Sequence, residues 1–319
     1  MKKKILITGG TGFIGRHLVK KLSDQGHSIR VFSLDAHRFP GSSLVEYISG
    51  DFLSLEDTSA ALKNVEVVYH LAATTTPGNS NERIIYDAQT NLIGSLRLIQ
   101  TAAEVEVERF IFISSGGAVY GPTESSSVNE DHPTNPLSAH GVSKLAIEKY
   151  LEIYRLQYGM DYRIARGGNP YGEWQDPERG QGFIPYVLGK IAKREEIVIW
   201  GDGSVVRDFF YVGDFVEALT CMLDDHQPQY IYNVGSGQGK SLIDILTLVE
   251  QVTGQRAHPS FKRSRPADVP YNCLDITRIT NSLGWNPKVD LNNGIQLTWD
   301  WVNAFLLKNI NSELILSDA

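Results

Sequence analysis

Cysteine is scarce in this chain of 319 residues, which contains only Cys221 and Cys273. Neither cysteine lies in a CxxC or mixed Cys/His spacing, so the sequence gives no support for a disulfide framework or a structural zinc site. We therefore expect two buried, reduced thiols, no disulfide and no bound metal.

Long apolar runs and a large basic charge are also lacking. No segment approaches the about 20 apolar residues of a membrane helix, and the apolar start of the chain is broken by Thr8, Gly9 and Gly10, far short of a signal-peptide core. The formal net charge of -7 disfavours nucleic acid as a partner, because contacts to phosphates need clustered Lys and Arg. We expect a globular, cytoplasmic protein without a membrane span.

Short apolar runs alternate with helical patterns through the first half of the chain. The candidate strands are residues 4–8, 29–32, 44–48, 65–72, 109–114 and 162–166, and the helical patterns lie near 13–25, 56–63, 83–105 and 139–158. Several strands are apolar at successive positions, as expected when helices cover both faces of a parallel sheet. The sequence predicts an α/β fold with a doubly wound parallel sheet.

The composition changes after Arg166, where "GGNPYGEWQDPERGQGFIP" is rich in glycine, proline and aromatic residues. We predict a dinucleotide-binding domain at 1–166 and a smaller lobe at 167–319. Part of 205–235 could return to the first domain. The smaller lobe is expected over the carboxyl edge of the sheet, where open α/β sheets bind ligands.

Three glycines follow the first strand in "ILITGGTGFIG". Gly9 permits a tight turn, Gly12 lets backbone N–H groups approach a diphosphate, and Gly15 allows the following helix to pack closely on the strand. The N-terminus of that helix supplies a partial positive charge for the phosphates. The strand, turn and helix together predict a dinucleotide site.

The end of the second strand leaves NAD and NADP both open. NAD-binding folds often place an acidic residue there for the adenosine ribose, but here Ser33 stands at the expected end and Asp35 follows two residues later. Asp35 favours NAD if the strand runs longer, whereas Ser33 with Arg38 would tolerate a 2'-phosphate. We favour NAD. Asp51 could hydrogen-bond the adenine or be an ordinary acidic turn residue.

Seven motifs then occur in order: "TGGTGFIG", "GDF", "HLAA", "SSGGAVYG", "HGVSK", "RGGNPYG" and "GDGSVVRDFFYVGD". Over almost its whole length the chain resembles the extended short-chain dehydrogenases/reductases, specifically the NAD-dependent nucleotide-sugar epimerases and dehydratases. The resemblance implies a Rossmann sheet that binds the dinucleotide and a C-terminal lobe that binds a nucleotide-diphosphate sugar.

The resemblance also assigns residues to both ligands. Those implied for the cofactor are Gly9, Gly12, Phe13, Ile14, Gly15, Asp35, Asp51, Phe52, Leu71, Ala72, Ala73, Asn91, Ser114 and Lys144. Those implied for the substrate are Asn169, Arg207 and Arg265, with Asp268 near the ribose. Two arginines from separate segments can close over one diphosphate.

Two of the three proton-handling positions depart from the pattern of the family. There, a Tyr in a YxxxK pair takes a proton from a sugar hydroxyl, assisted by a Ser or Thr after the fifth strand. Here Lys144 is present, but His140 replaces the Tyr and Gly116 replaces the Ser or Thr, with Ser115 adjacent. The i, i+4 spacing puts His140 and Lys144 on one helix face, and Gly116 is expected to widen the pocket.

His140 allows three interpretations. As a working base, its imidazole would be mostly neutral at pH 7 with the Lys144 cation keeping it so, although its reach is shorter than that of a Tyr. Alternatively, the chain is a catalytically silent protein that still binds NAD and a nucleotide sugar. A misaligned motif is disfavoured, because "GVSKLAIEKY" fits well. We favour the working enzyme, since the binding motifs are intact.

Ala118 favours the least demanding reaction. Relatives that eliminate water or carbon dioxide carry an acidic residue near this position, whereas epimerisation needs one acid/base group for both steps. The prediction is an isomerase of polysaccharide biosynthesis, a UDP-sugar 4-epimerase. A 4-keto sugar reductase that consumes NADPH is a further alternative, which Ser33 allows.

The helical pattern at 139–158 is apolar on two adjoining faces. One face includes Ile153 and Leu156, and the adjoining face includes Ile147 and Leu151. One of the two can cover the sheet, and the other needs another cover. Only a narrow stripe that includes Glu148 is left for solvent. Family members commonly pair this helix across a dimer, so we predict a homodimer, with burial inside one chain as the alternative.

Overall fold

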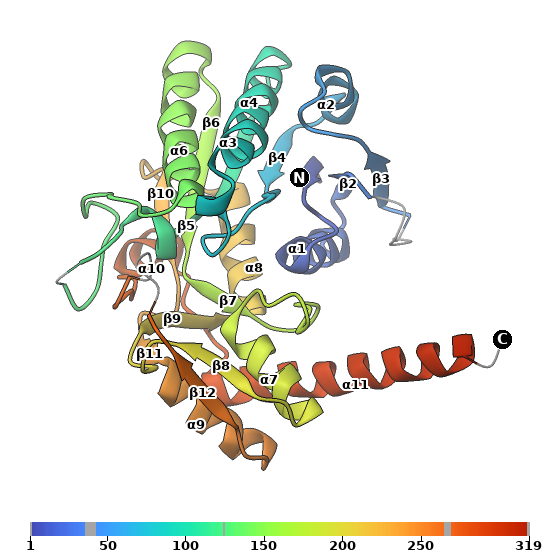
Figure 1. The fold of residues 1–319 in the computed structure, drawn as a ribbon. Coiled ribbons are helices and arrows are strands. Elements are labelled where there is room, and N and C mark those ends of the chain that lie inside the picture. The colour runs from blue at the N-terminus through green and yellow to red at the C-terminus, as the bar shows by residue number, and fades with distance from the viewer. Residues whose placement is uncertain (1, 36–42, 124, 265–268, 318–319) are drawn as a thin grey trace.

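The computed structural model describes residues 2–35, 43–123, 125–264 and 269–317 (Figure 1). Its centre is a seven-stranded sheet in the order β10-β6-β5-β4-β1-β2-β3, and every pairing in it is parallel. The strands are β1 (Lys4–Thr8), β2 (Ser28–Ser33), β3 (Val45–Ser49), β4 (Val67–His70), β5 (Arg109–Ser115), β6 (Asp161–Gly167) and β10 (Ile231–Val234). The predicted doubly wound parallel sheet is confirmed.

Helices cover both faces of this sheet (Figure 1). Because successive side chains of a strand point to opposite faces, Ile5 and Ile7 of β1 lie in one core and Leu6 lies in the other. The first core includes side chains of α1 (Phe13–Asp24), α8 (Val212–Cys221) and α10 (Thr277–Leu283). The second includes α2 (Leu55–Leu62), α4 (Gly94–Glu104) and α6 (Ala139–Tyr158). Burial on both sides explains the unbroken apolar runs.

Two elements beyond residue 205 lie with this sheet. Helix α8 packs against α1, and β10 extends the sheet beside β6. The division of the chain at 166 into two domains stays a prediction.

A further set of strands and helices forms a second body below the sheet in Figure 1. Its strands are β7 (Asn169–Tyr171), β8 (Ile197–Trp200), β9 (Val206–Tyr211), β11 (Gly239–Ser241) and β12 (Pro259–Lys262), and its helices are α7 (Phe183–Lys193), α9 (Leu242–Thr253) and α11 (Leu291–Ser317). The strands form two small sheets, β11-β9-β7 and β12-β8. Strand β6 continues almost directly into β7, so this body lies at the carboxyl edge of the parallel sheet. Among the described residues, no helix has both the length and the apolar character to cross a bilayer.

The helix predicted at 83–105 consists of three consecutive pieces. They are α3 (Ile84–Asp87), the π-helical turn η3 (Ala88–Ile93) and α4. A short helix, η2 (Ser80–Glu82), precedes them. Turns of the π type are rare and occur frequently at functional sites, and this one lies directly after Asp87.

Glu148 of α6 corrects the solvent-facing stripe predicted for this helix. Its side chain is 1% exposed, and its carboxylate accepts hydrogen bonds from Arg166 Nη2 at 2.6 Å and from Ser114 Oγ at 2.5 Å. A helical pattern identifies residues on one face, but it carries no information about a charged partner on a distant strand. The Glu148 carboxylate therefore ties α6 to β6 through the ion pair and to β5 through the Ser114 hydrogen bond.

Breaking this buried pair is expected to destabilise the fold strongly. Glu148→Gln removes one charge and leaves the Arg166 guanidinium buried without its counter-charge, which costs about 3–5 kcal/mol. Urea unfolding measures the loss. Glu152→Gln, one turn along α6, alters the partly exposed pair with Arg155 and should cost much less. Equal losses in the two variants would contradict the anchoring role of Glu148.

Candidate active site

The loops after β1 and β4 meet where the strand order reverses, the position at which open α/β sheets form a ligand crevice. Gly9 has a positive φ of 70°. A Cβ on Gly9 would lie 2.9 Å from the backbone nitrogen of Ala72, so the two loops approach too closely for a side chain. The backbone N–H of Leu71 donates to Thr8 O at 3.2 Å. The predicted cofactor segments around Gly9 and residues 71–73 are therefore neighbours.

The glycine turn is open toward the start of α1. Gly12 N donates to Gly9 O at 3.0 Å, and a Cβ on Gly15 would lie 2.2 Å from Gly9 O. Within α1, which the structure describes in full, no side chain caps the N-terminus and no acidic residue stands in the first turn. The N–H groups around Phe13 and Ile14 thus fit the diphosphate of a dinucleotide.

The second strand ends at Ser33, and Asp35 is exposed two residues beyond it. The Ser33 hydroxyl lies 2.9 Å from Thr11 Oγ1, so side chains join the end of β2 to the glycine turn. Arg38 lies outside the described residues.

Asp51 and Phe52 occupy the turn after β3. Asp51 Oδ1 accepts a hydrogen bond from Leu53 N at 2.9 Å, the geometry of an acidic turn residue. The Phe52 ring is packed so closely on α4 that a Cβ on Gly94 would lie 2.3 Å from it.

His140 and Lys144 lie on the first turns of α6 and are both buried, with exposed fractions of 9% and 7%. Lys144 Nζ donates to Ile113 O at 2.8 Å and lies 4.6 Å from the centre of the Phe112 ring. Gly141 permits a tight contact between α6 and α5 (Gly116–Val119), because its Cβ would lie 2.7 Å from Ala118 O. The helix therefore holds His140 and Lys144 beside the end of β5.

Burial sets the charge of both groups. Burial and, to a smaller extent, the nearby Lys144 cation lower the pKa of His140 to about 4, against the opposing effects of Asp87 and a backbone hydrogen bond to Thr75. The imidazole is therefore neutral at pH 7. Burial also lowers the pKa of Lys144 to about 8, opposed by Asp87 and Glu148, so Lys144 is still mostly a cation at pH 7.

Gly116 does not widen the pocket, contrary to the prediction. A Cβ at this position would lie 2.8 Å from Leu274 Cδ1, because the buried Leu274 side chain fills the space that a Ser or Thr would use. The Gly116 carbonyl accepts a hydrogen bond from Asn272 Nδ2 at 3.0 Å. Ser115, the last residue of β5, is partly exposed.

Asn91 and Ser114 are both buried and both bond to other protein segments. Asn91 Oδ1 accepts from Thr74 N at 2.8 Å, and Asn91 Nδ2 donates to Thr75 Oγ1 at 2.8 Å. Ser114 Oγ donates to Glu148. Their side chains thus hold the loop after β4 and the helix α6 in place.

The predicted substrate residues that the structure describes, Asn169 and Arg207, lie in the smaller body. Asn169 begins β7 and Arg207 lies on the neighbouring strand β9. Asn169 Nδ2 donates to Asp208 O at 3.4 Å, and Arg207 Nη1 donates to Val269 O at 2.6 Å. Arg265 and Asp268 lie outside the described residues.

Asp87 is a residue near His140 that the sequence did not reveal. Asp87 is fully buried and accepts hydrogen bonds from Asn91 Nδ2 at 2.7 Å and from Ser143 Oγ at 2.5 Å, as well as from Thr75 Oγ1. The available signal was the i, i+4 spacing of Asp87 and Asn91 in a helical pattern, where polar pairs are ordinary.

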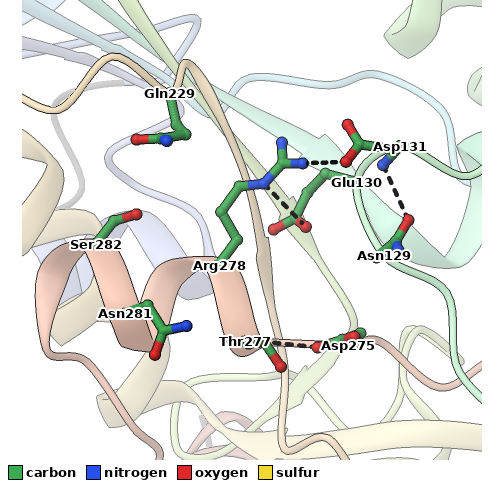
Figure 2. Close-up of a pocket in the computed structure, with 9 residues that line it drawn as sticks. All are labelled: Asn129, Glu130, Asp131, Gln229, Asp275, Thr277, Arg278, Asn281 and Ser282. Carbon is green, nitrogen blue, oxygen red and sulfur yellow. Dashed lines mark hydrogen bonds and ion pairs between the residues drawn. The ribbon is translucent and has the colours of Figure 1, made fainter.

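A polar cavity of about 380 Å³ lies elsewhere, at α10 (Figure 2). Its lining residues are Asn129, Glu130, Asp131, Gln229, Asp275, Thr277, Arg278, Asn281 and Ser282. Arg278 bridges its acidic groups, with Nη2 2.6 Å from Asp131 and Nε 3.4 Å from Glu130. None of the predicted site residues that the structure describes lines this cavity, so it is separate from the site on α6.

The doubly wound parallel sheet, the glycine turn at its reversal point and the His140–Lys144 helix beside it define an extended short-chain dehydrogenase/reductase. The chain belongs to the NAD-dependent epimerase/dehydratase family, which it matches over residues 5–235.

Relatives extend over nearly the whole chain. UDP-glucose 4-epimerase of Mycolicibacterium smegmatis is 32% identical over 305 residues, 92% of this chain and 97% of the relative. The structure of UDP-glucose 4-epimerase from Thermotoga maritima with UDP-glucose has a TM-score of 0.89 and 33% identity, covering 95% of this chain and 99% of the other. The corresponding complex of the Thermus thermophilus enzyme with NAD has a TM-score of 0.88 and 32% identity, covering 94% and 98%.

Because the His140 imidazole is buried in its neutral form, the free energy of unfolding should depend on pH. The pKa of His140 is 6.5 in its ordinary state, as in the unfolded chain, and about 4 in the folded protein. Between these two values the unfolded state binds more protons than the folded state. The free energy of unfolding therefore falls as the pH is lowered through this range. His140 alone should contribute a loss on the order of 2 kcal/mol between pH 7 and pH 5.

Urea unfolding of the wild type and of His140→Gln at both pH values measures this loss. The variant should lose less stability on acidification, whereas His226→Gln, at an exposed histidine, should follow the wild type. Parallel pH profiles for all three proteins would show that His140 is not buried in its neutral form.

Proposed function

We propose that the chain is an NAD-dependent epimerase of a nucleotide-diphosphate sugar, specifically a UDP-sugar 4-epimerase. The observation that carries the proposal is the buried pair on α6: an imidazole that is neutral at pH 7, four residues before a lysine that is still a cation. A neutral imidazole can accept a proton, and the similarity to UDP-glucose 4-epimerases supports the sugar class.

His140 acts as the acid/base group. Its imidazole takes the proton of the C4 hydroxyl as the alcohol is oxidised to a ketone, and it returns the proton when the ketone is reduced on the opposite face. The chemistry that NAD supplies when bound is the reversible removal of hydride from that carbon. Lys144 keeps the imidazole neutral between turnovers, because its positive charge disfavours a second cation nearby. Ser115 and the backbone of Gly116 border the reacting hydroxyl.

Ala118 supports epimerisation over elimination. It supplies no carboxyl at the position where eliminating relatives carry an acidic residue, so a single acid/base group serves both half-reactions. In this proposal His140 is the proton-transfer group, and α5 supplies no second acid.

The cofactor is assigned to the glycine turn and the loops beside it. The open N-terminus of α1 binds the diphosphate, the exposed Asp35 binds the adenosine ribose, and Asp51 and Phe52 border the adenine. Lys144 and Asn91 border the nicotinamide end. This assignment makes NAD the preferred dinucleotide over NADP.

The sugar nucleotide is assigned to the crevice between the sheet and the smaller body. Asn169 and Arg207 contact its diphosphate, together with Arg265, and Asp268 contacts the ribose. The guanidinium groups suit diphosphate oxygens. Cys273 is buried as expected, whereas Cys221 is only partly buried. Both are free thiols, which supports action in the reducing cytoplasm.

A homodimer through α6 is part of the proposal. Val142, Ile153 and Leu156 of this helix are apolar and more than half exposed, and Ile84 and Ile85 of the adjacent α3 are exposed as well. An apolar surface of this extent on a monomer is unusual. A second copy of the chain would cover it, in the manner commonly found in the family.

Epimerase activity is tested with NAD and a panel of UDP-sugars, by separating C4 epimers. Wild-type protein should interconvert at least one pair. His140→Phe should lower kcat roughly 100-fold or more, since it removes the acid/base group, and His226→Gln should retain full activity. Binding of a UDP-sugar without any product would identify a silent binding protein. Activity gained in His140→Tyr would mean that His140 is a lesion instead of an adapted base.

The dimer is tested by light scattering at micromolar concentration. Wild-type protein should have twice the mass of the chain, and Leu156→Glu should be monomeric because it places a charge in the apolar contact. Leu307→Glu, at an exposed leucine of α11, is the matched control and should stay dimeric. A monomeric wild type would refute this arrangement.

A further inference from the structure

Asp87 is a fully buried carboxylate at the end of α3 that joins three segments of the chain. Its Oδ2 accepts from Thr75 Oγ1 in the loop after β4 and from Asn91 Nδ2 in η3 at 2.7 Å. Its Oδ1 accepts from Ser143 Oγ of α6 at 2.5 Å. Burying a carboxylate is costly, and an apolar side chain would fill such a space at lower cost. The three donors around Asp87 therefore call for a role beyond packing.

Two of these segments bear directly on His140. Ser143 lies three residues after His140 and directly before Lys144, so its bond to Asp87 fixes this part of α6 relative to α3. The His140 ring donates to the backbone of Thr75, and this contact raises the pKa of His140. Asn91 additionally accepts from Thr74 N at 2.8 Å, which holds the backbone of the same loop. Asp87 thus connects the loop that contacts the imidazole with the helix that carries it.

A carbonyl can accept only from a protonated ring nitrogen. When the Thr75 carbonyl accepts from one nitrogen of the neutral ring, the other nitrogen has the lone pair that a proton acceptor needs. The position of Thr75 therefore determines both the tautomer and the direction of the free lone pair. In carboxylate-oriented histidines of unrelated enzymes, a correct tautomer is essential to proton transfer.

We propose that Asp87 is a positioning residue for His140. By holding Thr75 and Ser143 at once, it fixes the loop against α6 so that one ring nitrogen donates to the Thr75 backbone and the other faces the sugar hydroxyl. The proposal rests on the function proposed above. Asp87 itself does not touch the reacting atoms.

The charged groups around His140 determine how its pKa should change when Asp87 is removed. Lys144 is the cation of α6 that acts on His140, and Asp87 is the anion of α3 that acts on it. Glu148 acts on Lys144, and His70 of β4 is neutral because burial lowers its pKa to about 3. Since Asp87 opposes the effect of Lys144, its removal should lower the pKa of His140 further.

The test compares wild-type protein with Asp87→Asn, which keeps the shape and removes the charge. The kcat with the active UDP-sugar should fall about tenfold to a hundredfold, as for a misplaced acid/base group, while KM changes less than threefold. The acid limb of the pH profile should move to lower pH. Asp214→Asn is the control. Asp214 is a buried carboxylate of α8, remote from His140, that accepts a hydrogen bond from Val289 N at 2.9 Å. The kcat of this variant should be unchanged.

A second measurement does not depend on turnover. Nitrogen-15 spectra of histidine-labelled protein with NAD report the tautomer and pKa of His140, assigned with His140→Gln. Wild type should show one tautomer, and Asp87→Asn should show a mixture with a lower pKa. If the wild type has no epimerase activity, the proposed function fails, and these spectra still decide the role of Asp87.

Unchanged kcat and an unchanged ring signal in Asp87→Asn would overturn the proposal. If that variant does not fold, Thr75→Val and Ser143→Ala each remove a single donor. Each should shift the ring signal and lower kcat by a smaller factor, and wild-type behaviour in both would overturn the proposal equally.

Discussion

The parallel pairing of β4 between β1 and β5 is the constraint on which the site depends. Because all three strands run in one direction, the glycine turn, the loop at residues 71–75 and α5 emerge at the same edge of the sheet. The segments there touch through backbone atoms at positions where only glycine fits, as at Gly9 against Ala72 and Gly141 against Ala118. The arrangement of these loops is thus set by backbone contacts, and side chains such as His140 are added to a fixed frame.

The sequence predicts this frame well, because each strand is an unbroken apolar run and each such run requires cover on two faces. The His140–Lys144 pair was also foreseeable, since it depends only on helical spacing. Glu148 and Asp87 were not. A polar residue in a helical pattern is normally solvent-facing, and the donors that make burial favourable, such as Arg166 and Ser143, lie far away in the chain.

The surroundings of Gly116 were also unpredictable from the sequence, because they depend on a residue distant in the chain. Its lack of a Cβ suggested open space, but the space is filled by Leu274, which follows it by more than 150 positions in the chain. The loss of a hydroxyl at the end of β5 is accompanied by polar contacts at the end of β4, where Thr75 and Asp87 adjoin His140. The polar groups that adjoin His140 therefore come from the loop after β4 and from α3.

The anchoring of α6 by Glu148 has a consequence for any assembly of this chain. A helix held only by aliphatic packing can turn slightly about its axis when a partner binds. Here one carboxylate is bound by donors from both β5 and β6, so the helix has a single rotational setting. Contacts made on its exposed face would then leave the opposite face unmoved.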